Sequence, residues 1–310
     1  MRIVYMGTPD FAVPCLDILI KNKYDVCAVI TQPDREKGRG KKLAPPPVKV
    51  LAESCNIPVY QPVKVKTPEF VEVLKQLAPD LIVVVAFGQI LSKDILDIPA
   101  HGCINVHASL LPKYRGAAPI NWSIINGEKL TGVTTMYMDV GLDTGDMILK
   151  RELEIGDNQT FIELYEELSY LGSQLLLDTI KLIERGTAPR EKQNDSEASY
   201  APMITKQLGR IDWSKDAVSI KNLVRGTQPW PGAYTAYEGK TFKVFECEVI
   251  DNTRKNDDFG HITEAGKYGL VISCGVGSVR IRELQFENEK RMSVEAYLRG
   301  HNINVGSRLV

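Results

Sequence analysis

The chain has little that would place it in an oxidising compartment or a membrane. Its six cysteines form no Cys-x-x-Cys pair, and several lie in apolar patterns, where free cysteine behaves as a small hydrophobic side chain. Their spacing argues against a disulfide framework. The most apolar run, Leu81 to Phe87, is far too short to span a bilayer. Because no secretory signal precedes the first expected strand, a cytoplasmic location is expected.

The chain also lacks a strong net charge and the usual signatures of metal or dinucleotide binding. Its net charge is −1, so any nucleic-acid site must be a local patch. It has four histidines but no His-Glu-x-x-His or Cys/His ligand set, so no metal is expected. Gly7-Thr8-Pro9 breaks the Gly-x-Gly-x-x-Gly pattern of dinucleotide sites.

Strand and helix signals alternate through the first half of the chain. This rhythm predicts an α/β fold with a Rossmann-like, mostly parallel open sheet and helices on both faces. Ligands bind such sheets beyond the carboxyl ends of the strands, which places Phe87–Ile90 and His107–Ser109 at that edge. The strands are expected at 2–6, 26–30, 59–60, 81–85 and 104–107, and the helices at 11–21, 48–55 and 69–77.

A long helix, followed by a change from alternating strand and helix signals to short β-type runs, then divides the chain of 310 residues. Thr160 and Glu163 have capping-box spacing, and Gly186 suits the position after the helix. Five short β-type runs after residue 232 predict a small β-barrel, and periodicity alone leaves an OB-like or an SH3-like barrel open. We therefore expect domains at 1–186 and 206–310, joined by a linker at 187–205.

The most informative stretch is Ile104 to Pro112. Apolar Ile104 and Val106 alternate with Asn105 and His107, so the polar pair shares one face of a short strand. Their α-carbons would lie roughly 6.5 Å apart. An amide and an imidazole at that spacing can reach one carbonyl, the amide as donor to an oxyanion and the imidazole as proton carrier.

A glycine-rich loop with carboxylates follows at 138–146. Asp143 in this loop could orient His107. Taken singly, each piece also fits an ordinary interpretation, namely a half-exposed strand with a satisfied histidine and an acidic turn. Cys103 is an alternative nucleophile, but nothing beside it in the sequence would lower its pKa.

Together these residues resemble a known family, the formyltransferases that use 10-formyltetrahydrofolate. The resemblance covers essentially the whole chain and is closest to the members that act on methionyl-tRNA. It rests on Asn105-x-His107, Ser109-Leu110-Leu111-Pro112, Asp143, Met6 to Phe11, Arg115 to Ile120 and Gln228 to Ala233.

The resemblance implies an OB-like C-terminal domain and transfer of a formyl group from 10-formyltetrahydrofolate to the α-amine of initiator methionyl-tRNA, a step of translation initiation. It implies Asn105, His107 and Asp143 as catalytic residues. It also implies walls for the folate co-substrate at Phe87, Gly88, Gln89, Ile90, Ser109, Leu110, Leu111, Pro112, Asp139 and Gly141.

A basic segment, Arg35 to Lys42, carries five cations against one carboxylate. It suits phosphate contacts near the acceptor end of a tRNA, although a solvated charge run is the ordinary interpretation. By resemblance Arg39 is its key residue, and Lys41 and Lys42 accompany it. Lys206, among scattered C-terminal cations, is the further residue assigned to tRNA.

Three alternatives stay open at this point. A sugar-amine formyltransferase or a 10-formyltetrahydrofolate hydrolase would use the same chemistry, but the basic segment and the C-terminal barrel favour tRNA. A non-catalytic RNA-binding protein is the third alternative, and Asn105, His107 and Asp143 argue against it. No feature demands an oligomer, so a monomer is expected.

Overall fold

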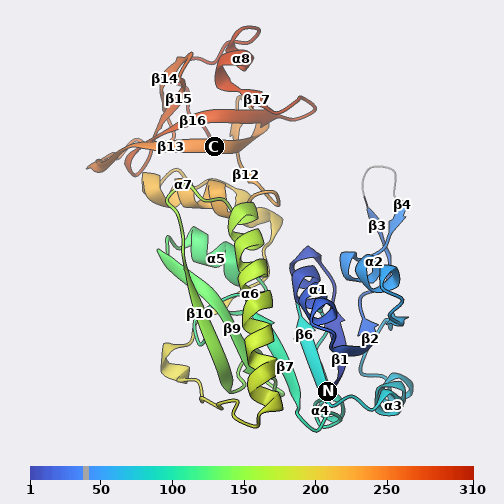
Figure 1. Cartoon of the computed structure of the whole chain (residues 1–310). Coiled ribbons are helices and arrows are strands. Elements are labelled where there is room, and N and C mark those ends of the chain that lie inside the picture. The colour runs from blue at the N-terminus through green and yellow to red at the C-terminus, as the bar shows by residue number, and fades with distance from the viewer. Residues whose placement is uncertain (38–41) are drawn as a thin grey trace. The chain divides into compact units, whose positions relative to one another are not determined.

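A computed structural model describes residues 1–37 and 42–310, and its first part is built on a seven-stranded sheet (Figure 1). The order of the strands is β10-β9-β7-β6-β1-β2-β5. Strands β7, β6, β1, β2 and β5 pair in parallel, which confirms the predicted mostly parallel α/β sheet. The strands are β1 (Arg2–Gly7), β2 (Asp25–Ile30), β5 (Val59–Tyr60), β6 (Leu81–Val85), β7 (Cys103–His107), β9 (Leu130–Tyr137) and β10 (Met147–Glu154).

Strands β9 and β10 were not expected from the sequence. Both extend the sheet in antiparallel pairing, β9 against β7 and β10 against β9. Strand β9 is buried on both faces although it carries buried threonines, so it shows no alternation of apolar and polar residues. Hydrogen bonds allow this burial, because the Thr134 hydroxyl donates to the Ser109 carbonyl at 2.7 Å and Thr135 pairs with Thr179.

Helices cover both faces of this sheet. Ile82 and Val84 of β6 pack in one core cluster with Val71 and Leu74 of α3. On the other face, α6 approaches β7 closely enough that a Cβ at Gly172 would lie 3.0 Å from Val106 Cγ1. The helical segments of this part are η1 (Asp10–Ala12), α1 (Val13–Lys21), α2 (Pro47–Ser54), α3 (Pro68–Leu77), α4 (Lys93–Leu96), α6 (Phe161–Glu184) and η2 (Asp195–Glu197).

The predicted ends of the long helix are confirmed. The Glu163 carboxylate accepts a hydrogen bond from the Thr160 backbone N–H at 2.7 Å, which is half of the capping box. Gly186 follows the helix with φ +68°, a conformation that glycine adopts at little cost.

The described residues of the basic segment include two short strands, which the sequence did not indicate. Strands β3 (Arg35–Lys37) and β4 (Lys42–Ala44) pair antiparallel. At their base, Lys49 Nζ lies 2.9 Å from Asp34 Oδ1. Arg39 and Lys41 lie outside the described residues, and the side chain of Lys42 is likewise not described.

The C-terminal part is an antiparallel β domain, as predicted. Its strands follow the order β12-β13-β16-β15-β14, with β17 beside β16, and Phe242, Ile272 and Ile281 lie in one core cluster. The elements are η3 (Lys206–Gly209), α7 (Ala217–Gly226), β12 (Ala233–Tyr237), β13 (Lys240–Lys255), β14 (Ile262–Gly266), β15 (Gly269–Ser273), β16 (Val276–Phe286), β17 (Met292–Ser293) and α8 (Val294–Leu298).

Two compact units emerge, and they do not divide the chain at one point. The first unit holds residues 1–116, 130–154 and 165–201, and the second holds 117–129, 155–164 and 202–310. Helix α5 (Pro119–Ile125) therefore belongs with the C-terminal domain. Most of the segment expected as a linker lies within the first unit. Among the helices that the structure describes, none is long and apolar enough to cross a membrane.

Candidate active site

Strand β7 presents the two polar residues that the sequence singled out. Asn105 pairs with Val84 of β6 and Met136 of β9, so it sits in the interior of the sheet. His107 lies two residues further, at the carboxyl end of β7, and therefore on the same face. Asn105 is half-buried, and its amide makes no hydrogen bond with the described part of the chain. Both ends of the amide are thus available to a ligand.

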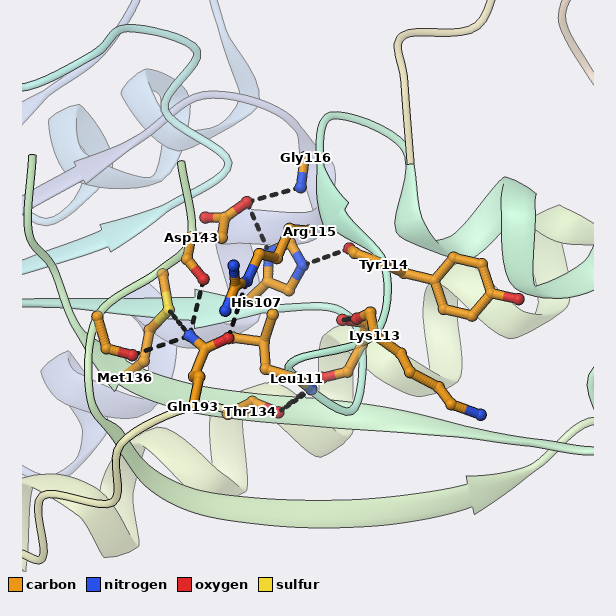
Figure 2. Close-up of polar contacts among 12 residues, drawn as sticks. His107, Leu111, Lys113, Tyr114, Arg115, Gly116, Thr134, Met136, Asp143 and Gln193 are labelled. Carbon is orange, nitrogen blue, oxygen red and sulfur yellow. Dashed lines mark hydrogen bonds and ion pairs between the residues drawn. The ribbon is translucent and has the colours of Figure 1, made fainter. Parts of the chain in front are cut away.

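The imidazole of His107 is buried, held by a hydrogen bond at Nε2 and facing Asp143 through Nδ1 (Figure 2). Nε2 lies 2.9 Å from the Tyr114 carbonyl oxygen. A carbonyl only accepts, so Nε2 carries a hydrogen in either charge state. Nδ1 lies 3.7 Å from Asp143 Oδ2. Nδ1 is therefore the nitrogen that gains or loses a proton, and it faces the carboxylate.

Asp143 is brought to the site by the loop between β9 and β10. Its φ is +53°, a left-handed conformation that few residues other than glycine adopt. Oδ2 accepts a hydrogen bond from the Gly116 backbone N–H at 2.8 Å, while Oδ1 has no partner among the described residues. The side chain is 14% exposed. The carboxylate therefore lies within reach of His107 and of a small molecule or water.

Gln193 and Arg115 complete the site, and no sequence pattern pointed to Gln193. The Gln193 amide donates to the Asp143 carbonyl at 2.7 Å and to the Gly145 carbonyl at 2.8 Å. Arg115 Nε donates to Gln193 Oε1 at 2.9 Å, and its guanidinium also bonds Asp195. Gln193 lies in a segment without periodicity, so no pattern could have found it.

The residues assigned to the folate fall into three loops, two at the carboxyl ends of β6 and β7 and one between β9 and β10. Phe87 is buried in the core cluster that also holds Val84 of β6. The exposed residues of its loop are Ala86, Gly88 and Ile90. The Gln89 amide is engaged by its own protein, since Oε1 accepts from the Val65 N–H at 2.7 Å and Nε2 donates to Pro62. This loop is thereby fixed before any ligand arrives.

The second loop is also held by internal bonds. Ser109 and Leu111 are buried, and the Ser109 hydroxyl donates to the Lys113 carbonyl at 2.6 Å. Leu110 lies between them and Pro112 follows through a cis peptide. Leu110 itself is half-buried.

In the loop that carries Asp143, the remaining predicted residues shape the turn. Asp139 Oδ1 accepts from the Gly141 N–H at 2.9 Å and from the Thr144 hydroxyl at 2.7 Å. A Cβ at Gly141 would lie 1.9 Å from Thr144 Oγ1, so the turn itself requires glycine there.

Two other kinds of chemistry find no support. The Cys103 side chain is buried in the core, and burial raises its pKa to about 12. Such a thiol is inert at neutral pH, which leaves no nucleophile at this position. Within residues 1–37 and 42–310, no group of three or more His, Cys, Asp or Glu side chains is placed to hold a metal ion.

Comparison with protein families gives two matches. The family model described as formyl transferase matches residues 1–180, and the model described as formyl transferase, C-terminal domain, matches residues 203–302. The methionyl-tRNA formyltransferase of Acetivibrio thermocellus is 56% identical over 309 residues, covering 100% of this chain and 99% of the relative. That of Clostridioides difficile is also 56% identical, covering 99% of each.

Solved structures share the fold. A sugar 3N-formyltransferase called WlaRD, solved with dTDP and 5-N-formyl-THF, has a TM-score of 0.69 at 22% identity and covers 94% of this chain and 99% of its own. HypX from Aquifex aeolicus, in complex with tetrahydrofolic acid, has a TM-score of 0.64 at 17% identity, covering 99% of this chain and 50% of its own.

Proposed function

The chain belongs to the formyl transferase family, and from that premise we propose that it transfers the formyl group of 10-formyltetrahydrofolate to the α-amino group of initiator methionyl-tRNA. Relatives of full length at 56% identity act on methionyl-tRNA by name. The observation that carries the chemistry is that His107 faces Asp143 at the carboxyl end of β7, two residues from Asn105, whose side-chain amide makes no hydrogen bond with the described residues.

The reaction begins with attack of the neutral amine on the formyl carbon. A free α-amine has a pKa of about 7.7–8.0, so part of it is neutral at pH 7 without a catalyst. Attack turns the formyl oxygen into an oxyanion on a tetrahedral carbon. The Asn105 amide is the proposed donor to that oxygen, because it has no bond to break within the described protein.

Two proton movements follow, one from the attacking nitrogen and one to the departing folate nitrogen. His107 carries them through Nδ1, since Nε2 is held by the Tyr114 carbonyl. The distance of 3.7 Å between Nδ1 and Asp143 Oδ2 exceeds a direct hydrogen bond. The two groups therefore exchange a proton through a water or after a small approach, with Asp143 balancing the charge of the imidazolium.

For tRNA, we propose contacts from the basic segment and the C-terminal domain. The exposed Lys206 begins η3 and makes no ion pair with the described residues, so its charge is available to a phosphate. Lys42 begins β4, and Arg39 and Lys41 come between β3 and β4 in the sequence. A chain of net charge −1 needs such local cations to attract RNA.

The proposed function is tested by incubating the protein with 10-formyltetrahydrofolate and charged initiator tRNA, and by assaying hydrolysed product for N-formylmethionine. Parallel reactions contain an amino sugar nucleotide or no acceptor. Product from the sugar alone, or formate release without any acceptor, would assign the chain to one of the alternative folate enzymes.

Salt dependence gives a first prediction about the acceptor. If several phosphates are contacted, the logarithm of the tRNA association constant falls linearly with the logarithm of salt concentration, by about 0.9 for each phosphate neutralised on a duplex. Filter binding between low and moderate salt measures this slope. A flat dependence would contradict a tRNA acceptor and favour a small amine.

A second prediction concerns Arg39. Arg39→Ala removes one guanidinium from the basic segment, so we expect KM for methionyl-tRNA to rise while the affinity for the folate stays near wild type. A single lost phosphate contact also reduces the salt slope by about 0.9. Lys23→Ala, which removes an exposed cation from the turn after α1, is the control. An equal loss of folate affinity in Arg39→Ala would place this residue at the folate site instead.

A further inference from the structure

We propose that Gln193 is a positioning residue that fixes the backbone of Asp143 and thereby the place of its carboxylate beside His107. This inference rests on the proposed catalytic roles of Asp143 and His107. It adds to them a residue from the segment after α6, some 50 positions along the chain from Asp143.

The first support is the pair of hydrogen bonds from Gln193 to the turn at 143–145 (Figure 2). One amide nitrogen donates to the carbonyls of Asp143 and Gly145, at 2.7 and 2.8 Å. Asp143 has φ +53°, a conformation that persists where the surroundings impose it. The Gly116 N–H holds the end of the side chain. Gln193 therefore holds the backbone while Gly116 holds the carboxylate.

Arg115 determines which end of the Gln193 amide faces the turn. Its side chain is buried, and Nε donates to Gln193 Oε1 at 2.9 Å. A guanidinium offers donors only, so the amide oxygen must face it and the NH2 group must face the two carbonyls. The bond from the same guanidinium to the exposed Asp195 fixes its outer end at 2.8 Å.

The short segment Tyr114–Gly116 contacts both catalytic side chains. Strand β8 (Arg115–Gly116) follows Tyr114, whose carbonyl holds His107, and its Gly116 N–H holds Asp143. Strand β8 pairs in parallel with β11 (Tyr200–Ala201). The Tyr114 N–H also donates to the Ser199 hydroxyl. The segment from Gln193 to Ala201 thus forms the outer support of the His107–Asp143 pair.

A residue of this kind should act on turnover and leave substrate binding alone. Loss of the two donors frees the turn at 143–145, so the carboxylate is no longer held at one distance from Nδ1. Misplacement of a catalytic group by about 1 Å can cost 10²-fold in rate. We expect kcat to fall by about 10- to 100-fold, and KM for each substrate to stay within about twofold.

Two substitutions test this in the full-length protein. Gln193→Met keeps the length of the side chain and removes both donors. Gln193→Glu keeps an acceptor for Arg115 Nε and also removes the donors, which places a carboxylate against two carbonyls. Gln285→Met is the matched control, because Gln285 of β16 is a half-buried glutamine whose amide donates to a backbone carbonyl, that of Glu289, at 2.8 Å.

The measurements are kcat, KM for the folate and for methionyl-tRNA, and the midpoint of thermal unfolding. A fall in kcat in both Gln193 variants, with KM kept and Gln285→Met unchanged, supports the positioning role. Wild-type kcat in either folded variant overturns it, as does a lowered midpoint with unchanged kcat. Should Gln193→Met fail to fold, Gln193→Glu decides. Absence of product from wild-type protein would refute the proposed function and is thereby distinguished from failure of this inference.

Discussion

His107→Ala should lower the rate of formyl transfer by about 10²- to 10⁴-fold, the usual contribution of a positioned proton carrier. The loss should fall on kcat, because Nδ1 handles protons that move only after the substrates are bound. Retention of tRNA and binding of the folate should persist. Initial rates of formylmethionyl-tRNA formation, with filter binding for tRNA, measure the two effects separately.

Two further variants sharpen this test. His107→Gln removes the titratable group but can still donate to the Tyr114 carbonyl, so it separates proton transfer from the packing of a buried side chain. It should be about as inactive as His107→Ala. The control is His101→Ala, which makes the same change at an exposed histidine just before β7. Full activity of His107→Ala would eliminate the mechanism.

The sequence predicted the half of the site that strand alternation encodes. Asn105 and His107 alternate with apolar neighbours, and a strand with that pattern has one possible assignment of faces. The buried run at 81–85 likewise indicated a central parallel strand, and β6 lies between β1 and β7. In each case the information is local, because burial and periodicity are set by the same few residues.

The other half of the site depends on contacts that no local pattern records. The Asp143 carboxylate reaches the Gly116 N–H from a residue that has a left-handed φ. The glycines near it in the sequence do not by themselves predict that conformation. Gln193 lies in a polar stretch that looks like an ordinary linker, although its amide bonds two carbonyls of that turn. Strand β9 was not predicted because its buried threonines remove the alternation of apolar and polar residues. Their hydroxyls find hydroxyl and carbonyl partners inside the protein.

Asn105→Ala should lower kcat by about 10²- to 10³-fold, the usual cost of removing one oxyanion donor. The Asn105 amide makes no hydrogen bond with the described residues, so its removal breaks nothing in the resting protein and the midpoint of thermal unfolding should hardly change. KM should also change little, because the donor is needed where negative charge develops. Steady-state kinetics and a melting curve measure these three quantities.

The decisive comparison is with Asn105→Asp, which keeps the size of the side chain and replaces its donor by a carboxylate. An ionised carboxylate accepts only, and it would repel the developing oxyanion. Asn105→Asp should therefore be at least as slow as Asn105→Ala, although it fills the same space. If Asn105→Asp were instead as active as wild type, the amide at 105 would have no part in stabilising the oxyanion.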